Sequence, residues 1–296
     1  MPQKISVIIN TRNEEKNIAK AINSVKWADE IIVCDMYSDD KTAEIAKDLG
    51  AKVIFHKRVN YVELARNFAI SKAKNDWILV LDPDEQIDED LAKRLQALVN
   101  KSSSFDFVEI PRKNIIFNKW IKHSGWWPDY QIRLFKKGSV VWQSQIHSKP
   151  QAKGTGLKLA SEEKWSIIHQ NYQTIEQFIS RMNRYTQIQA EELKKSGYKF
   201  RWQDIFDKPL NEFLSRYFTN EGYKDGLHGL SLSLLQAFSF FVVYLRVWET
   251  TKFKEQELNL AEFENQTTRV SKDINYWIKE SKGAKGLKKF LKIFKR

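Results

Sequence analysis

The chain has 296 residues, 42% of them hydrophobic, so it can bury a substantial core and is not a disordered chain. Its formal net charge of +12 predicts an acidic partner: nucleic acid, anionic lipid or a phosphorylated substrate. The single cysteine, Cys34, excludes an internal disulfide, and its apolar neighbours are typical of an inert core thiol. The first residues lead directly into an apolar run without a signal peptide, so we expect the start of the chain in the cytosol.

Four short apolar runs alternate with amphipathic segments in the first part of the chain. The runs cover residues 5–9, 31–34, 52–55 and 77–81. Between them, apolar residues recur every three or four positions, which is the period of a helix. Strands that alternate with helices are typical of a parallel sheet with right-handed crossovers and helices on both faces. The sequence therefore predicts an α/β fold for this part of the chain.

The fourth run, residues 77–81, leads directly into two carboxylates one residue apart, Asp82 and Asp84. Five consecutive apolar residues predict a strand that is buried on both faces. The two aspartates then lie at the carboxyl end of the strand, where open α/β sheets bind ligands, and carboxylate oxygens suit Mg²⁺ or Mn²⁺. The alternative is a turn at Pro83 that leads into the next helix, with Asp84 or Asp88 as its cap.

Polar residues also follow the first two strands, with Thr11 to Glu14 after the first and Asp35 after the second. Because parallel strands end at the same edge of a sheet, these side chains are expected to join Asp82 and Asp84 there, around a nucleotide. Neither a GxGxxG loop nor a Walker sequence is present, so backbone amides are not expected to hold the diphosphate. A cation on Asp84 and basic side chains are expected to hold it instead.

In combination, these motifs resemble the family 2 glycosyltransferases of GT-A fold, over roughly residues 4 to 150. The resemblance rests on residues 5–14 (ISVIINTRNE), 32–42 (IVCDMYSDDKT), 65–67 (ARN) and 81–85 (LDPDE). Two later segments, residues 125–135 (GWWPDYQIRLF) and 220–229 (NEGYKDGLHG), resemble the lipopolysaccharide core glucosyltransferases within that family. The resemblance implies a Rossmann-like GT-A domain that transfers a sugar from a nucleotide donor with inversion, with Mn²⁺ or Mg²⁺ as cofactor.

The resemblance also implies roles for the residues at the sheet edge. Thr11 and Glu14 would line the nucleoside pocket and Asp35 would hold the uracil, whereas Asp82 would contact the ribose or the metal and Asp84 would bind the metal. Arg66 and Arg133 could reach phosphate oxygens, although a solvated charge is the alternative for Arg66. The expected nucleotide-sugar contacts are Thr11, Asn13, Glu14, Asp35, Arg66, Asp82 and Arg133.

The acceptor hydroxyl needs a general base on the face of the sugar opposite the leaving group. Asp129 is the candidate for this base, because it follows Trp126 and Trp127, whose apolar surface could raise its pKa and stack on a sugar ring. The alternative for Asp129 is an ion pair with Arg133, four residues on.

His147 lies near the end of a predicted strand over residues 140–147. The resemblance implies a histidine near the diphosphate here, so a metal or phosphate contact is one hypothesis and a structural hydrogen bond is the other. His56, His123 and His169 have no partner at metal-ligand spacing in the sequence.

The C-terminal part of the chain is predicted to be helical. Residues 175–188 have an apolar face, and residues 227–248 form the most hydrophobic stretch. The polar residues within this stretch favour a helix in one leaflet over a single spanning helix, and a soluble core helix is the alternative. Residues 285–296 combine an apolar stripe with six basic residues, a pattern typical of an anchor on an anionic membrane, with a frayed tail as the alternative.

We therefore expect a catalytic domain over residues 1–165 and a helical membrane-associating region over residues 166–296. The predicted activity is transfer of a hexose from a UDP-hexose, UDP-glucose first, to a lipid-linked glycan at the cytoplasmic face of the inner membrane. One alternative is a polyprenyl-phosphate sugar synthase. The other is a non-enzymatic lipid- or nucleic-acid-binding protein, but no nucleic-acid-binding pattern is visible, so nucleic acid is not an expected partner.

Overall fold

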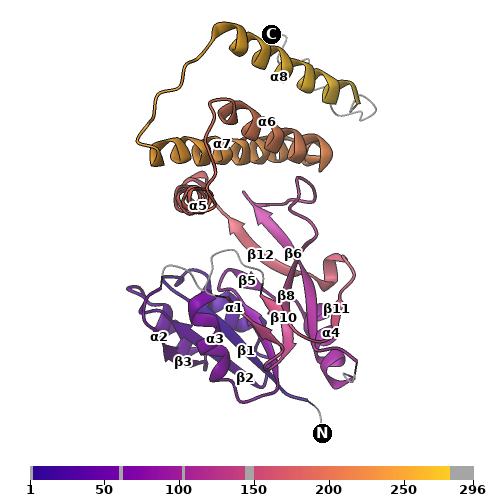
Figure 1. Cartoon of the computed structure of the whole chain (residues 1–296). Helices are drawn as coiled ribbons and strands as arrows, with labels where there is room; N and C mark the ends of the chain where they lie inside the picture. Colours follow the sequence, from indigo (N-terminus) through magenta and orange to yellow (C-terminus); the bar gives the residue numbers. More distant parts are fainter. Residues whose placement is uncertain (1–2, 60–62, 102–103, 144–149, 281–296) are drawn as a thin grey trace. The chain divides into compact units, whose positions relative to one another are not determined.

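The computed structural model describes residues 3–59, 63–101, 104–143 and 150–280 (Figure 1). The chain divides into two compact units. The first unit comprises Met1–Ile115 and Pro128–Asn171, and the second comprises Ile116–Trp127 and Tyr172–Arg296. The domain boundary predicted at residue 165 stays a prediction, since compactness alone does not define a functional domain.

The first unit is built on one sheet with the strand order β3-β2-β1-β4-β8-β6-β12-β5. Strands β3, β2, β1 and β4 are parallel, and β8 then runs antiparallel to both β4 and β6. The main strands are β1 (Ile5–Thr11), β2 (Glu30–Asp35), β3 (Lys52–Phe55), β4 (Trp77–Leu81), β6 (Phe107–Ile116), β8 (Asp129–Lys136) and β12 (Ile167–Tyr172). The shorter strands are β5 (Glu85–Gln86), β7 (Lys119–Trp120), β9 (Val140–Val141), β10 (Gln151–Ala152) and β11 (Gly156–Lys158).

Alternate residues of the parallel strands enter two separate cores, one on each face of the sheet. Val7 and Ile9 of β1 belong to the core that includes helices α1 (Ile18–Ser24), α2 (Thr42–Asp48) and α4 (Glu89–Asn100). Ile8 belongs to the other core, which includes helix α3 (Glu63–Ser71). Because both faces are covered, these strands carry continuous apolar runs. The predicted α/β class, with helices on both faces of the parallel strands, is confirmed.

The first helix is preceded by a loop. Asn13 lies in this loop after β1 with a left-handed backbone (φ 56°), and α1 begins at Ile18. The Asp88 side chain accepts a hydrogen bond from the Leu91 amide (3.0 Å) and caps α4, as the alternative for the turn at Pro83 expects. Asp84 is therefore not needed as the cap of this helix.

The second unit is largely helical. Helix α7 packs against α5 and α6, and its Val243 and Val247 are buried. Leu232, nearer the start of α7, is buried in a cluster with Ile116 and Ile121. The first turn of α7 lies close to the residues that precede this helix. A Cβ on Gly229 would lie 1.8 Å from the Gly222 carbonyl oxygen, so only glycine fits at this position. The helices are α5 (Ile175–Lys195), α6 (Asp204–Leu214), α7 (Leu227–Thr250) and α8 (Leu260–Glu280), with a π-helical turn at Ser215–Thr219 and 3₁₀ helices at Glu163–Trp165 in the first unit and Gly222–Asp225 in the second.

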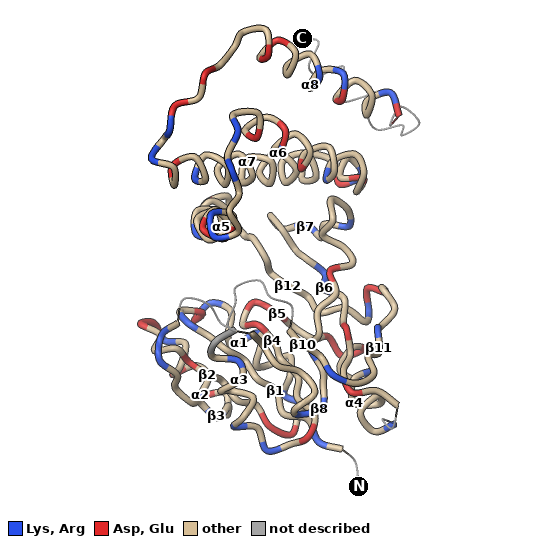
Figure 2. The backbone as a smooth tube through the Cα atoms, in the orientation of Figure 1, with Lys and Arg blue, Asp and Glu red and all other residues tan. Residues whose placement is uncertain are grey.

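Helix α7 is the one helix among the described residues that is long and apolar enough to cross a membrane, judged by length and composition only. The sequence from Leu227 to Leu245 contains no Lys, Arg, Asp or Glu, and the tube of α7 in Figure 2 is uncharged for most of its length. Leu234 and Phe238 are about half exposed on its free side. The structure thus leaves an apolar side of α7 uncovered by the described residues, in keeping with the predicted helix at 227–248.

Candidate active site

Three of the predicted site residues end neighbouring parallel strands. Thr11 is the last residue of β1, Asp35 the last of β2, and Asp82 directly follows β4. Thr11 and Asp35 are partners in the register of β1 and β2, which fixes them side by side. The structure therefore brings these residues to one edge of the sheet, as the strand pattern predicts.

The loops after β1 and β2 are held together by short hydrogen bonds. The amide of Asn13 donates to Ser38 Oγ (2.8 Å), and the Asn13 side chain accepts from the Asp39 amide (2.8 Å). The Glu14 amide donates to the hydroxyl of Thr42 (2.8 Å), the first residue of α2. Asp35 is fully buried and accepts from both the amide (2.7 Å) and the hydroxyl (2.6 Å) of Ser38. These hydrogen bonds fix the two loops against each other at this edge of the sheet.

Thr11 is buried, and its hydroxyl oxygen has no hydrogen-bond partner among the described residues. A buried polar atom without a partner is uncommon, and a bound ligand is one way to satisfy it. Thr11 therefore offers a hydrogen-bonding oxygen at the end of β1, between the loops after β1 and β2 and the strand β4 that precedes Asp82.

Asp82 is bound by two guanidiniums that come from opposite directions in the sequence. Arg66 of α3 pairs with Oδ1 of Asp82, and Arg133 of β8 donates to Oδ2 (2.5 Å). Arg133 also donates to Oε1 of Glu85 (2.6 Å), a carboxylate that is fully buried. Arg66 is itself only 7% exposed and stacks over the ring of Trp142, so the solvated-charge alternative for Arg66 is wrong.

Arg112 of β6 extends this ion-pair chain to the candidate base. It donates from Nη1 to Oε1 of Glu85 (3.2 Å), and from Nε (2.8 Å) and Nη2 (2.6 Å) to Oδ2 of Asp129. Asn114 donates to the same oxygen (3.2 Å), whereas Gln131 donates to Oδ1 (2.8 Å). Carboxylates and guanidiniums therefore alternate without a break in a set that we call the charge chain: Arg66, Asp82, Arg133, Glu85, Arg112 and Asp129.

The guanidiniums decide the charge state of the carboxylates. Burial alone would raise the pKa of Asp82, but Arg133 and Arg66 outweigh it and hold this pKa far below its usual range. Burial opposes ionisation of Asp129 too, and Arg112 together with Asn114 and Gln131 still lowers its pKa. The pKa of Arg133 is raised because Asp82 and Glu85 outweigh the effect of its burial. Both aspartates are therefore ionised at neutral pH.

Two expectations about Asp129 are wrong. Its pKa is lowered rather than raised, because guanidinium and amide donors surround it. Its ion-pair partner is Arg112 and not Arg133, because β8 is a strand, in which residues four apart are separated by about 13 Å. Trp126 and Trp127 belong to the second unit, where Trp126 packs edge-on against Tyr172 and Trp127 against Trp120, so their stacking on a sugar stays a prediction.

Asp84 lies beside a histidine that sequence spacing did not reveal. His169 of β12 has its Nε2 3.5 Å from Oδ2 of Asp84, and both side chains are almost fully buried. The strands fix this approach, because the Gln170 amide donates to the Asp84 carbonyl oxygen (2.9 Å) and His169 is the register partner of Glu85. The other predicted histidine, His147, lies outside the described residues.

The Asp84–His169 pair has the chemistry of a divalent-cation site. Nδ1 of His169 lies 2.7 Å from the side-chain oxygen of Asn114, so this nitrogen carries the ring proton. When the ring is neutral, Nε2 is an acceptor that faces Oδ2 of Asp84, and a cation would bind to both atoms. A carboxylate oxygen and an imidazole nitrogen suit Mn²⁺, and the residues present fit such an ion. Among the described residues no cluster of three or more His, Cys, Asp or Glu could hold a metal, so the remaining ligands would come from the nucleotide and water.

Four residues of this site were missed by sequence reasoning: Glu85, Arg112, Asn114 and His169. A signal for three of them exists in the sequence, because Arg112 and Asn114 are spaced i, i+2 in one strand, as are His169 and Asn171 in another. Polar residues at this spacing share one face of a strand. Which strands lie together, however, is a property of the sheet order.

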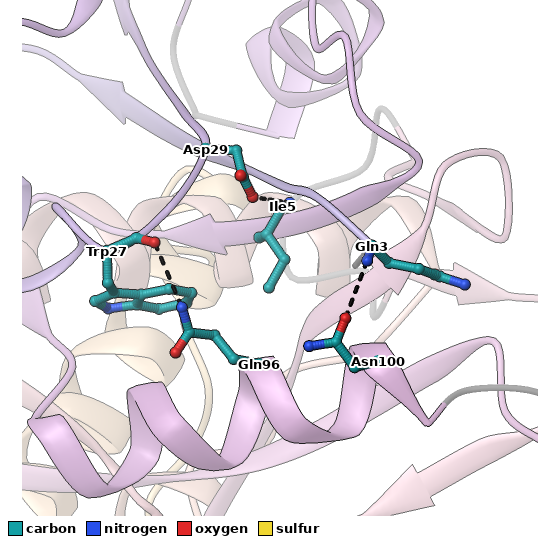
Figure 3. Close-up of a pocket in the computed structure, with 6 residues that line it drawn as sticks. All are labelled: Gln3, Ile5, Trp27, Asp29, Gln96 and Asn100. Atoms are coloured by element: carbon teal, nitrogen blue, oxygen red, sulfur yellow. Dashed lines mark hydrogen bonds between the residues drawn. The ribbon is translucent and has the colours of Figure 1, made fainter. Parts of the chain in front are cut away.

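A cavity of about 300 Å³ lies in the first unit, away from these residues. It adjoins Ile5, at the start of β1, whereas Thr11 is at the end of that strand. Figure 3 shows its polar walls bonded to one another, with the Gln3 amide donating to Asn100 (3.0 Å) and the Ile5 amide to Asp29 (2.9 Å). The cavity is therefore at the opposite edge of the sheet from the charge chain.

The sheet edge, its paired loops and its acidic residues belong to an α/β domain of the kind that binds ligands at the carboxyl ends of its strands. Residues 6–154 match the family model described as glycosyl transferase family 2. An uncharacterised glycosyltransferase of Rickettsia typhi is 31% identical over 254 residues, which cover 81% of this chain and 85% of the relative. The chain belongs to glycosyl transferase family 2, and the predicted family and its GT-A fold class are confirmed.

Two further groups of proteins are similar to this chain. The lipopolysaccharide core biosynthesis glycosyltransferase LpsC of Rhizobium meliloti is 22% identical over 256 residues, which cover 84% of this chain and 94% of LpsC. Among solved structures, S. aureus TarS (residues 1–349) has a TM-score of 0.43 at 17% identity and covers 82% of this chain and 91% of its own. A glucosyl-3-phosphoglycerate synthase from Mycobacterium tuberculosis, with Mn²⁺ and UDP bound, has a TM-score of 0.33 at 23% identity and covers 36% of this chain and 43% of its own.

The charge chain predicts how stability depends on pH. Because the folded pKa values of Asp82 and Asp129 lie below their unfolded values, both groups stabilise the fold above about pH 4, and this stabilisation is lost as the pH falls below that value. Arg133→Met should lower the free energy of unfolding at pH 7 by about 3–5 kcal/mol, because the buried Glu85 and the partly buried Asp82 would be left with less compensation. It should also flatten the loss of stability in acid.

Urea denaturation followed by circular dichroism between pH 3 and pH 7 measures both effects. Arg58→Met is the matched control, because the Arg58–Asp39 pair is exposed and should contribute only about 0–1 kcal/mol. Equal losses in the two variants would contradict the account.

Proposed function

We propose that the chain is a divalent-cation-dependent, inverting hexosyltransferase that uses a UDP-hexose, with UDP-glucose the first donor to test. Membership of glycosyl transferase family 2 supports sugar transfer over a non-enzymatic role. The observation that carries the proposal is the approach of Asp84 to His169 at the same sheet edge as the charge chain, which ends in Asp129.

The nucleotide-binding part of the proposal rests on the paired loops after β1 and β2. Asp35 is buried beneath them, and Thr11 offers a buried hydroxyl without a partner among the described residues. In this proposal Thr11, Asn13, Glu14 and Asp35 contact the nucleoside. Arg66, Arg133 and Asp82 hold the edge of the site beside the diphosphate, with Arg66 and Arg133 neutralising part of its charge.

Asp84 and His169 are the residues that would hold Mn²⁺ or Mg²⁺. When bound, the cation would act as a Lewis acid that stabilises the negative charge developing on the departing diphosphate. Asp82 is less suited to a direct metal bond, because two guanidiniums already occupy its oxygens.

Asp129 is proposed as the general base that accepts the proton of the acceptor hydroxyl as the new glycosidic bond forms. It is ionised, and 26% of its side chain is exposed, so an acceptor can reach it. Three of its four hydrogen bonds are to Oδ2 and one is to Oδ1, which leaves Oδ1 the better proton acceptor. Arg112 fixes the carboxylate in position at the cost of some basicity.

A lipid-linked glycan, such as a lipopolysaccharide core, is the proposed acceptor. The relative LpsC is a lipopolysaccharide core biosynthesis enzyme, and its match extends along 84% of this chain. The exposed apolar side of α7 and the basic tail at residues 285–296, which lies outside the described residues, support peripheral binding at the cytoplasmic leaflet. Trp126 and Trp127 are proposed to stack on the acceptor or the donor sugar.

Asp84→Ala should abolish UDP release from nucleotide sugars and the Mn²⁺-dependent part of UDP binding, because the cation would lose its anionic ligand. Calorimetric titration of UDP with and without Mn²⁺ and a coupled UDP-release assay measure the two effects. Asp90→Asn, on the exposed first turn of α4, is the control and should behave as wild type. Normal turnover by Asp84→Ala with unchanged Mn²⁺ dependence would contradict the assignment of Asp84 as a metal ligand.

Asp129→Asn should lower kcat by about 10²–10⁴-fold and leave UDP affinity unchanged, because it keeps the shape of the side chain and removes its proton-accepting charge. Steady-state kinetics with the preferred donor, together with UDP titration, measure this split. Asp106→Asn is the control, since Asp106 lies outside the charge chain, where it forms a partly exposed pair with Lys136 and accepts from the Thr155 amide (2.9 Å). A variant that loses donor binding while retaining kcat would contradict the base assignment.

Removal of residues 285–296 should release the protein from anionic vesicles. Each of the six basic residues lost contributes about 1 kcal/mol at an anionic surface, so vesicle affinity should fall by several orders of magnitude. Co-sedimentation with vesicles of phosphatidylcholine and phosphatidylglycerol measures this. A second variant with the six basic residues replaced by Gln separates charge from apolar contact, and unchanged partitioning of both variants would refute the anchor.

A further inference from the structure

Asn114 connects the two halves of the candidate active site. It is fully buried on β6, which lies between β8 and β12 in the sheet. Its side-chain nitrogen donates to Oδ2 of Asp129 on β8 (3.2 Å). Its side-chain oxygen lies 2.7 Å from Nδ1 of His169 on β12 and also accepts from Asn171 (3.4 Å). The amide thus bridges the candidate base and the histidine beside Asp84.

The neighbours of Asn114 leave its amide one orientation. Oδ2 of Asp129 already accepts two hydrogen bonds from Arg112, as an ionised carboxylate does, so the group that faces it must be a donor. The –NH₂ of Asn114 therefore faces Asp129 and the carbonyl oxygen faces His169. The Asn171 side-chain amide donates to that same oxygen, which independently marks it as an acceptor.

The orientation of this amide in turn fixes the proton of the imidazole. A carbonyl oxygen can only accept, so Nδ1 of His169 must be the protonated nitrogen. In the neutral ring this leaves the lone pair on Nε2, which faces Asp84 at 3.5 Å. A ring with the opposite tautomer would present an N–H to Asp84 and could not bind a cation through that nitrogen.

We propose that Asn114 is a positioning residue that holds His169 in the tautomer needed to bind a cation together with Asp84, and that ties this histidine to Asp129. The proposal rests on the proposed metal-dependent transfer. Its main claim, however, concerns the tautomer of the His169 imidazole in the metal-free protein, which can be measured without any turnover. Histidines that bind metals commonly have the second ring nitrogen fixed in this way, and loss of the partner weakens metal affinity about 10–100-fold.

Two substitutions separate the bonds that Asn114 forms with Asp129 and with His169. Asn114→Leu preserves the approximate volume and removes both of these bonds, together with the contact from Asn171. Asn114→Asp keeps an acceptor for Nδ1–H of His169 and removes the donor to Asp129. Asn171→Leu is the matched control, because it removes the longer 3.4 Å contact to the same oxygen and leaves the bonds of Asn114 to His169 and Asp129 in place.

The primary measurement is the tautomer of His169 in metal-free protein labelled with ¹⁵N-histidine, from two-bond ¹H–¹⁵N correlation spectra at about pH 8, where an ordinary imidazole is neutral. The chain has five histidines, and His169 is assigned by its absence from the spectrum of His169→Gln. Wild type, Asn171→Leu and Asn114→Asp should show protonated Nδ1. Asn114→Leu should lose this preference.

The second measurement is Mn²⁺ affinity in the presence of UDP, from paramagnetic resonance of free Mn²⁺. Asn114→Leu should bind Mn²⁺ about 10–100-fold more weakly than wild type, and Asn114→Asp should retain the affinity while kcat falls in both.

Protonated Nε2 in wild type, or an unchanged spectrum in Asn114→Leu, would overturn the role of Asn114. If the wild type binds no Mn²⁺ with UDP, the proposed function fails instead, and the spectra alone decide on Asn114. If Asn114→Leu does not fold, loss of the Nδ1 proton in Asn114→Asp overturns the proposal and its retention supports it.

Discussion

The pairing of Asp82 with Arg66 and Arg133 is the interaction on which the rest of the site depends. Asp82 follows the central strand β4, and its two partners come from α3 and β8, which flank it. Removal of either guanidinium would leave a partly buried carboxylate with less compensation for its desolvation. The pair therefore fixes the backbone turn that presents Asp84, two residues on.

From Asp82 the charge chain passes through Arg133, Glu85 and Arg112 to Asp129. The residues proposed to bind the donor and to serve the acceptor are therefore connected by a continuous series of ion pairs. Glu85 also accepts a hydrogen bond from the amide of Asp82 (2.9 Å), which closes the turn on itself. Each of the four inner members of the chain is oriented by two neighbours rather than one. The arrangement of the proposed site is thereby built into the folded protein before substrates bind.

The parallel half of the first unit was predictable from sequence, because each strand and helix has its own apolar period. Asp35 and Asp82 could be placed at one edge of the sheet for the same reason, since parallel strands end together. The pairing of Asp129 was not predictable in this way. It depends on β8 lying beside β6, and the register that sets Arg112 opposite Asp129 is not encoded in either strand alone.

His169 shows the same limit more clearly. It is separated from Asp84 by most of the first unit in sequence, and only the pairing of β12 with β5 brings the two together. The i, i+2 spacing with Asn171 marks a polar strand face but cannot name the facing residue. The pKa of Asp129 was misjudged for a related reason, because its neighbours in sequence are tryptophans while its neighbours in space are donors.

The most direct test of the account is the position of a bound cation. Crystals of the protein grown with UDP and Mn²⁺, with data collected at the manganese absorption edge, give an anomalous map that locates the ion without assumptions about ligands. The account predicts one strong peak within bonding distance of an Asp84 carboxylate oxygen and Nε2 of His169, in contact with the diphosphate. A nucleotide bound at the sheet edge with manganese elsewhere, or with no peak beside Asp84, would contradict it.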